Sequence, residues 1–522
     1  MIFHRQRPLA ALLAVLVAAG AGMWLLAGAA GEMNRRHVVV DGVPLDEVHP
    51  AGASGQRHPG VVVAHGFAGS ARLMAPFGDS LAARGYVVVL LDFSGHGANT
   101  RPLPDGTAST ETSTAALQHD LEVATAHLRG LPDVDPARIA LAGHSMGASA
   151  VTRYAVAHPE VTATVAISLP DSSTVLPDRP ARLLLLVGGL EFPNFRAEAE
   201  RAAGPAREGR SMVVVPAVEH ISILYAPRTH REMVAWLDDS FGGPAADRPL
   251  PAPYRRVGGA AVLLLSLLIG LYPVARLLLG GARASWPRLS VPQVGPTVAV
   301  AAAAAAFAGL IAPFLPTNRL PLALGGYIVG FTAMAGAVIL GYRRWRGAIF
   351  PAPAPASPAG PLSDAASPAG PLSDAASVAR PGMLRLVVAA PVLIGYAATA
   401  IALPLHLGLT HALPVGARWW LLAVMWAAFA VLAYAAERVT AGNSFGVLAV
   451  SAVAVIALTG AAVVGLTGGF LVLIVPLLAI LLLWQAVWSA VLHRFSAPSW
   501  LIAIVGSLVV AWPLATALPM IG

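Results

Sequence analysis

Two patterns of hydrophobic positions divide this chain of 522 residues. Between residues 35 and 243, apolar runs of four to eight residues alternate with segments whose apolar positions recur every three to four residues. Short apolar runs bounded by turn residues are typical of buried strands, and the second pattern is typical of amphipathic helices. The expected strands are 61–64, 87–91, 138–142, 161–168, 183–187 and 212–215, and the expected helices are 71–84, 112–129, 146–157, 194–203 and 227–240.

Strands that alternate with helices form a mostly parallel sheet with helices on both of its faces. Ahead of the first such strand, residues 38–43 read Val-Val-Val-Asp-Gly-Val, and Asp-Gly favours the two-residue turn of a hairpin. The pattern therefore predicts a doubly wound α/β fold for residues 35–243, preceded by a hairpin.

Apolar runs long enough to cross a bilayer, which takes about 20 residues, fill most of the remaining chain. The first covers residues 9–30 and exceeds the roughly 7–15 apolar residues of a secretory signal peptide. We expect an uncleaved N-terminal anchor there, with a signal peptide as the alternative. Eight later spans are expected at 257–280, 292–315, 320–341, 383–404, 418–436, 445–466, 469–491 and 498–520.

These patterns set the expected domain boundaries. We expect an N-terminal transmembrane anchor at 1–34, an α/β domain at 35–243, a Pro- and Ala-rich linker at 244–256 and an all-α, polytopic membrane domain at 257–522. A Pro/Ala/Ser-rich loop at 347–382, which contains one decapeptide twice, interrupts the membrane domain. Because this composition cannot bury a hydrophobic core, we expect a flexible loop.

Charge is distributed unevenly between the two parts of the chain. Residues 1–250 carry a net charge of −4 and residues 251–522 a net charge of +11, and every basic residue is Arg. With a cytoplasmic N-terminus, twelve Arg flank the cytoplasmic ends of the spans and four flank the outer ends. Basic residues concentrate on the cytoplasmic side, so we expect the α/β domain on the non-cytoplasmic face of the cell membrane. The twelve are Arg5, Arg7, Arg276, Arg283, Arg288, Arg343, Arg344, Arg346, Arg380, Arg385, Arg438 and Arg494, and the four are Arg255, Arg256, Arg319 and Arg418.

The composition also excludes several classes of protein. A hydrophobic share of 56% with only 12% charged residues excludes a disordered chain and an ordinary soluble enzyme. The chain has no Cys, so it has no disulfide, thiolate nucleophile or Cys-ligated metal. The excess of Arg lies between apolar runs and not on a soluble face, which argues against nucleic acid as a partner.

Residues 143–147 read Gly-His-Ser-Met-Gly, the pattern G-x-S-x-G. An expected strand precedes the pattern and an expected helix follows it, which is the context of a nucleophile elbow. The turn needs glycines because neighbouring side chains would collide, and it lifts the Ser145 hydroxyl to the carboxyl edge of the sheet. The context favours a nucleophilic Ser145 over an ordinary Gly-rich turn.

These residues and two further motifs resemble the α/β-hydrolase superfamily, and within it the compact esterase, lipase and peptidase-like serine hydrolases. Residues 61–69, Val-Val-Val-Ala-His-Gly-Phe-Ala-Gly, resemble the strand and His-Gly loop that supply half of the family's oxyanion hole. Residues 91–97, Leu-Asp-Phe-Ser-Gly-His-Gly, resemble the family's following loop. The resemblance covers residues 36–241 and implies a serine hydrolase that uses no metal and no cofactor.

The resemblance also implies a catalytic triad in the chain order Ser, acid, His. Ser145 is then the nucleophile, and His220, which follows the last expected strand, is the base. Glu191 is the expected acid, because Gly-Gly-Leu-Glu stands where the family has Gly-x-x-Asp. Asp171 is the fallback acid, and Asp178 is a weaker one.

Two backbone N–H groups should stabilise the oxyanion of a serine hydrolase. The elbow predicts the N–H of Met146, and the His-Gly loop predicts the N–H of Phe67. The remaining candidates are expected in other roles: structural for His65, His96 and His144, at the surface or next to the triad for Glu219, and at the surface for His230.

The connection at 169–181, where large lids usually enter in this family, has only thirteen residues and cannot form a helical cap. We therefore expect an open site that suits small or membrane-presented acyl esters. Ester hydrolysis ranks first, and peptidase, thioesterase and acyltransferase activities are alternatives on the same triad. The apolar residues expected to shape the site include Phe67, Met146, Leu169, Phe192 and Ile221.

A hypothesis from another class is a membrane scaffold or transport module that carries a degenerate hydrolase domain. The expected spans hold no Asp or Glu in their interiors, whereas ion-coupled transporters usually carry intramembrane ionisable groups. Because the serine, the histidine and the oxyanion loop are all present, we favour the enzyme, with an acyl ester and the lipid bilayer as its partners.

Overall fold

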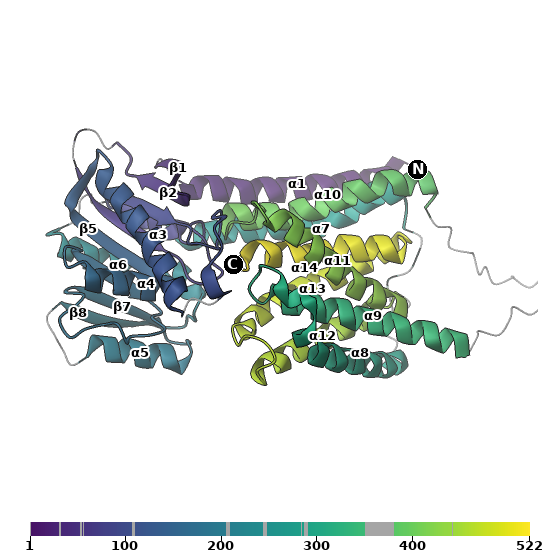
Figure 1. Ribbon diagram of the computed structural model, residues 1–522. Coiled ribbons are helices and arrows are strands. Elements are labelled where there is room, and N and C mark those ends of the chain that lie inside the picture. The colour runs from purple at the N-terminus through teal and green to yellow at the C-terminus, as the bar shows by residue number, and fades with distance from the viewer. Residues whose placement is uncertain are drawn as a thin grey trace, which may run out of the picture.

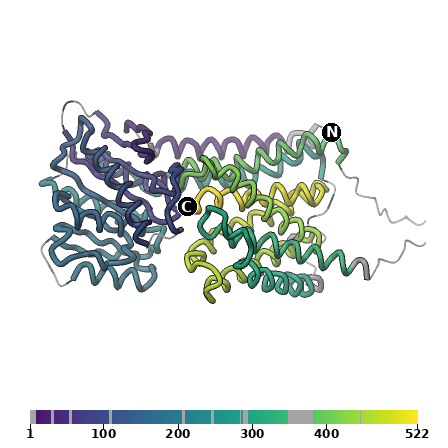
Figure 2. Tube along the Cα trace, viewed as in Figure 1, coloured from purple at the N-terminus to yellow at the C-terminus, as the bar shows by residue number. Residues whose placement is uncertain are grey.

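The computed structural model describes residues 2–30, 33–52, 55, 57–106, 110–204, 209–243, 248–282, 284, 286, 291–349, 381–440 and 442–522. An α/β domain lies at one end of a bundle of long helices, as Figure 1 shows. In Figure 2 the N-terminal end of the chain lies at the far end of the bundle, and the C-terminal end lies against the α/β domain.

The α/β domain contains one sheet of eight strands in the order β1-β2-β4-β3-β5-β6-β7-β8. The first two strands form the predicted hairpin around Asp41 and Gly42, which both have positive φ. Strands β3 to β8 are parallel to one another, which confirms the predicted α/β class. The strands are β1 (Asn34–Val40), β2 (Val43–His49), β3 (His58–Ala64), β4 (Val87–Leu91), β5 (Val134–His144), β6 (Ala163–Ile167), β7 (Leu183–Gly188) and β8 (Arg210–Val215).

Helices cover both faces of this sheet. One apolar core joins the sheet to α2 and α6, and a second joins its other face to α3 and α4. Apolar residues on α5 pack with β7 in a smaller cluster that extends the core near the active-site edge. The helices are α2 (Ala75–Ala83), α3 (Glu111–Gly130), α4 (Met146–Ala157), α5 (Pro193–Ala203) and α6 (Pro227–Ser240).

Nine helices in the described part of the chain are long and apolar enough to cross a membrane, as the hydrophobic runs predict. The helix α14 lies deepest in the bundle, and α1 packs along its outside against α7 (Figure 1). The nine are α1 (Ile2–Ala30), α7 (Tyr254–Leu279), α8 (Val291–Ile311), α9 (Gly325–Ile349), α10 (Met383–Gly408), α11 (Arg418–Val439), α12 (Ser444–Val463), α13 (Leu471–Arg494) and α14 (Ser499–Ala517).

Two predicted connections differ from the structure at their ends. The predicted linker at 244–256 is shorter, because α7 already begins at Tyr254. The predicted loop at 347–382 begins later, because α9 continues to Ile349, and most of that loop lies outside the described residues.

The C-terminal segment joins the α/β domain to the bundle through backbone hydrogen bonds. Met520 N–H donates to the Gly95 carbonyl at 2.8 Å, and Leu103 N–H donates to the Met520 carbonyl at 2.9 Å. On the other side of the segment, Ala323 N–H donates to the Pro519 carbonyl at 2.9 Å. The segment therefore fixes a loop of the α/β domain against the loop that precedes α9.

Side chains strengthen the same interface. Arg418 is fully buried and donates from Nη1 to the carbonyls of Ala515 and Leu518, and from Nη2 to the carbonyl of Gly95, each at 2.8 Å. The interface also contains an ion pair between Arg256 and Asp79, with 2.9 Å between Nε and Oδ2. These contacts hold the α/β domain in one position on the bundle, instead of leaving it on a loose tether.

Candidate active site

Ser145 lies in a strained turn between β5 and α4. Its φ of 51° and ψ of −117° are unusual for a residue with a side chain. A Cβ on Gly147 would lie 2.5 Å from the carbonyl oxygens of Ala64 and His65, and a Cβ on Gly143 would collide with the Gly147 carbonyl. Both glycines of the motif are therefore required for the turn that exposes the serine hydroxyl.

The structure brings Ser145, His220 and Glu191 together at the carboxyl edge of the sheet. The Ser145 hydroxyl lies 3.1 Å from His220 Nε2, and His220 Nδ1 is hydrogen-bonded to Glu191 Oε1. The Glu191 side chain is fully buried and that of His220 is 9% exposed. With the proton on Nδ1, the imidazole can accept the Ser145 proton at Nε2.

Glu191 is held by two further hydrogen bonds. Its Oε2 accepts from the Ser168 hydroxyl at 2.9 Å and from the Gly188 N–H at 3.0 Å. Ser168 follows β6 and has a φ of 53°. The sequence interpretation missed Ser168, because only the strand order, in which β6 and β7 are neighbours, shows that it faces Glu191.

The other candidate carboxylates do not reach His220. Asp171 is exposed and accepts from the N–H and the hydroxyl of Ser173, at 2.9 and 2.8 Å. Asp178 is exposed as well. Glu219 accepts from the N–H groups of Ile221 and Ser222 on the surface, which is one of the two roles expected for it.

Two neighbours fix the position of His220. His144 Nε2 lies 2.9 Å from the His220 carbonyl oxygen, and the ring of Phe195 lies 4.7 Å from the His220 ring, centroid to centroid. Burial lowers the pKa of His144 to about 3, so this imidazole is neutral at neutral pH and donates to the carbonyl. Phe195 is a second residue that the sequence interpretation missed.

The backbone groups predicted for the oxyanion hole lie beside Ser145. Met146 is the first residue of α4, so its N–H has no intrahelical acceptor and lies at the positive end of the helix dipole. Phe67 follows Gly66, where a Cβ would lie 3.1 Å from the Ser145 Cβ. The loop is therefore close enough to the nucleophile for a second donor.

The remaining histidines have structural roles. His65 Nδ1 donates to the Gly66 carbonyl at 2.7 Å and its Nε2 accepts from the Phe93 N–H at 3.1 Å, while His96 donates to the Ser94 carbonyl. The surface position predicted for His230 is wrong. His230 is buried, lies 2.9 Å from both the Ser80 hydroxyl and the Leu224 carbonyl oxygen, and stacks on Phe77.

A cavity of about 590 Å³ opens beside the Ser145 hydroxyl, between the α/β domain and the bundle. The predicted connection at 169–181 forms no helix, but the expected open site is wrong, because the bundle supplies one wall. The ring of Phe470 packs on Phe67 with 4.5 Å between centroids. The wall consists of Ala323, Leu324, Gly468, Gly469, Phe470 and Leu473.

Only part of the predicted apolar lining surrounds this cavity. Phe67 and Met146 line it, as expected. Leu169 instead belongs to the buried core, while Phe192 and Ile221 are about half exposed and lie outside the lining. The bundle supplies one wall of the cavity, and Pro170 and Asp171 of the 169–181 connection also line it.

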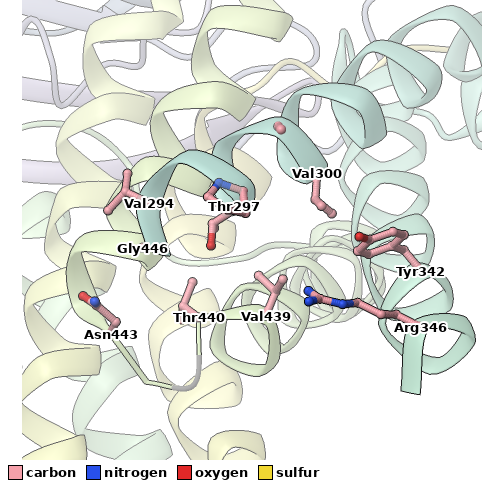
Figure 3. A pocket seen from close by; sticks show the side chains of 11 residues that line it. Val294, Thr297, Val300, Tyr342, Arg346, Val439, Thr440, Asn443 and Gly446 are labelled. Carbon is pink, nitrogen blue, oxygen red and sulfur yellow. The ribbon is translucent and has the colours of Figure 1, made fainter. Parts of the chain in front are cut away.

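A second cavity, of about 620 Å³, lies at the opposite end of the bundle (Figure 3). There the Arg346 side chain points toward Val439 and Thr440. Near the same end, α11 extends three residues past the expected span, to Val439, and Glu437 lies in its last turn. Glu437 is buried and bonded to Ser489 and His493, at 2.5 Å each.

In the described ranges, no three His, Asp or Glu side chains are arranged to hold a metal ion.

Comparisons with known proteins match the α/β domain. A family model described as serine aminopeptidase, S33, matches residues 55–213. An uncharacterised protein of Mycobacterium tuberculosis is 32% identical over 212 residues, which cover 35% of this chain and 72% of that protein. Cutinase 1 of Thermobifida cellulosilytica is 31% identical over 108 residues, which cover 21% of this chain and 38% of the cutinase.

A similar solved structure is dienelactone hydrolase from Anabaena variabilis, with 21% identity and a TM-score of 0.32, over 40% of this chain and 98% of that chain. The sheet order and the strained serine ahead of α4 define the class of the domain as an α/β hydrolase. Through its N-terminal part, the chain belongs to the α/β-hydrolase superfamily, in the family it shares with the Mycobacterium tuberculosis protein.

Proposed function

We propose that this protein is a membrane-bound serine hydrolase that cleaves carboxylic esters through an acyl-enzyme intermediate. The observation that carries the proposal is the hydrogen-bonded series Ser145–His220–Glu191 at the N-terminus of α4. A serine hydroxyl is a weak nucleophile until a neighbouring base accepts its proton, and His220 is placed to do so.

In the proposed reaction, Ser145 Oγ attacks the ester carbonyl carbon while its proton moves to His220 Nε2. The N–H groups of Met146 and Phe67 stabilise the oxyanion. His220 then protonates the leaving alkoxide, and a water that His220 deprotonates releases the acid from Ser145. Glu191 holds the imidazole tautomer and stabilises the imidazolium throughout.

The bundle supports a position in a membrane. Nine long apolar helices in the described chain, and Arg residues concentrated at one end of the expected spans, fit a multi-pass protein of the cell membrane. In this orientation the α/β domain lies on the non-cytoplasmic face. The similarity to a cutinase over 108 residues and the apolar cavity wall favour an acyl ester as the substrate.

Aminopeptidase activity is the second candidate. The matching family model bears that description, and Asp171, the one carboxylate among the described residues that line the cavity, is placed to bind an α-ammonium group. Hydrolysis of alanine 4-nitroanilide that the Asp171→Asn variant loses would favour the aminopeptidase. Hydrolysis of 4-nitrophenyl butyrate alone would favour the esterase.

The nucleophile is tested with the Ser145→Ala variant of the full chain. This variant should lose labelling by a fluorophosphonate probe and turnover of 4-nitrophenyl butyrate, while its thermal unfolding stays close to that of the wild type. Ser240→Ala, on the far helix α6, is the matched control and should change neither. Labelling that persists in Ser145→Ala would contradict the proposal, and a wild-type protein that is not labelled would favour a scaffold with a degenerate domain.

A further inference from the structure

Three cavities lie in series from the catalytic serine into the bundle. The cavity at Ser145 shares Leu324 and Gly468 with a second cavity of about 310 Å³. This second cavity shares Leu466 with a third, of about 470 Å³. The shared residues show that each cavity adjoins the next.

Leu324 and Gly468, on two loops of the bundle, form the wall that the first two cavities share. A Cβ on Gly468 would lie 2.9 Å from Leu324 Cδ2, so a larger residue there would press on this side chain. The backbone of Leu324 has a φ of 61°, which is unusual for leucine. The two residues are therefore in contact, and an acyl chain that crosses between the cavities has to move the Leu324 side chain.

The third cavity is a groove along the seam between α8 and α12. Its lining is entirely apolar, and Ala302, Ala306, Ile456 and Gly460 in it are exposed, so the groove is open toward the surroundings of the bundle. From Val464 to Val453 it follows α12 for eleven residues, about 16 Å at 1.5 Å per residue. That is about half of the ~30 Å hydrocarbon core of a bilayer.

We propose that this groove holds the acyl chain of a bilayer lipid whose ester lies at Ser145. The inference rests on the proposed function and names its substrate class, a long-chain acyl ester drawn laterally from the leaflet next to the α/β domain. One leaflet is as deep as one acyl chain, which matches the length of the groove. The groove ends at Leu466, beside the middle cavity, so the part of the acyl chain nearest the ester has to cross that cavity to place the ester at Ser145.

A second copy of the chain is the alternative occupant, because grooves of small residues also pack helices in membranes. The two further cavities between the groove and Ser145 favour the lipid. A dimer contact has no need of cavities beyond Leu466, whereas a substrate path requires space there.

The test uses the full chain in phosphatidylcholine vesicles, with 4-methylumbelliferyl oleate in the bilayer or 4-methylumbelliferyl butyrate in the water. Gly460→Phe on α12 and Ala306→Phe on α8 place a ring in the groove. No atom lies within 4 Å of a Cβ on Gly460, so the helix can accept the ring. Val463→Phe is the matched control, because Val463 is 74% exposed on the same helix and lies outside the groove.

Both groove variants should lower kcat/KM for the oleate by at least about tenfold, since one methylene contact in an apolar pocket already provides about this discrimination. Turnover of the butyrate should stay at the wild-type rate, which also shows that the variants fold. Equal oleate rates in Gly460→Phe, Ala306→Phe and wild type would overturn the proposal. So would an equal loss in Val463→Phe.

A binding measurement separates this inference from the proposed function. Phosphatidylcholine with a diazirine at the end of one acyl chain should crosslink to residues 453–464 of the Ser145→Ala protein, and Gly460→Phe should remove this crosslink while Val463→Phe keeps it. The result does not depend on turnover. If the wild type fails to hydrolyse butyrate but the crosslink behaves as expected, only the proposed function is wrong. If Gly460→Phe changes the oligomeric state and leaves the crosslink in place, the groove belongs to a second copy.

Discussion

The hydroxyl of Ser168 donates a hydrogen bond of 2.9 Å to Oε2 of Glu191, the oxygen that does not contact His220. A hydrogen bond to a charged group contributes about 1.5–3 kcal/mol. Because the Ser168 hydroxyl bonds to Glu191, we expect Ser168 to act by holding Glu191 in position. We expect Ser168→Ala to lower kcat by about ten- to a hundredfold and to leave KM for 4-nitrophenyl butyrate unchanged. A purely structural role would instead lower the amount of active enzyme, which titration with a fluorophosphonate measures.

The acid itself should be more sensitive than its neighbour. Glu191→Gln keeps the shape of the side chain but favours the wrong imidazole tautomer, and we expect kcat to fall on the order of 10⁴-fold, as when a triad acid becomes an amide. Asp171→Asn is the control and should leave ester turnover nearly unchanged, because among the described residues Asp171 is hydrogen-bonded to Ser173 and not to His220. The opposite ranking of the two variants would transfer the role of the acid to Asp171.

Arg418 should stabilise the contact between the α/β domain and the bundle. Its guanidinium holds three carbonyl oxygens that come from both parts of the chain. Arg418→Met keeps much of the side-chain volume but loses these bonds, so we expect Tm to fall by several degrees and limited proteolysis between the two parts to become faster. Arg228→Ala removes an exposed ion pair on α6 and should change the free energy of unfolding by no more than about 0.5 kcal/mol.

Local patterns predicted the elements of the α/β domain well. The expected strand at 87–91 and the expected helix at 146–157 have the same bounds as β4 and α4. Motif order was enough to bring Ser145, His220 and Glu191 together, because each follows the carboxyl end of a strand in one parallel sheet. These predictions succeeded because they used residues that are close in sequence, or strand ends that lie at one edge of the sheet.

Contacts between segments that are distant in the sequence could not be predicted from local patterns. Arg418 looked like a charge beside a span, but it is buried between two parts of the chain. The wall at Phe470 lies more than 300 residues from Ser145, and apolar spans do not specify where their connecting loops dock. His230 occupies a helix that looks amphipathic, and its ring is nevertheless stacked on Phe77 in the core.

Acid should destabilise the α/β domain through His230. Burial lowers the pKa of His230 to about 4, below its usual value of 6.5, so the unfolded chain binds more protons between these pH values. Stability therefore rises with pH in this window and is lost as pH falls from about 6.5 to about 4. We expect the drop in Tm from pH 7.5 to pH 5 to be smaller in His230→Gln than in the wild type.

This comparison isolates His230 from groups that titrate with the opposite sign. Burial raises the pKa of Asp92 to about 6, so Asp92 favours the folded state as pH falls. Asp92 is present in both proteins, and its contribution cancels in the difference. Equal drops in Tm for wild type and His230→Gln would show that His230 does not control the acid sensitivity.

The orientation in the membrane can be tested by single-cysteine labelling, because the natural chain contains no Cys. Gly130→Cys lies at the end of α3 in the α/β domain, and Gly281→Cys lies just after α7, at the opposite end of the bundle. A Cβ at either glycine meets no atom within 4 Å, so both variants should fold. The Arg distribution predicts that an impermeant maleimide labels Gly130→Cys in intact cells and labels Gly281→Cys only after the membrane is permeabilised.

Permeabilised cells, in which both variants should react, provide the control for accessibility. The reverse pattern would place the α/β domain in the cytoplasm, and its lipid substrate would then come from the inner leaflet.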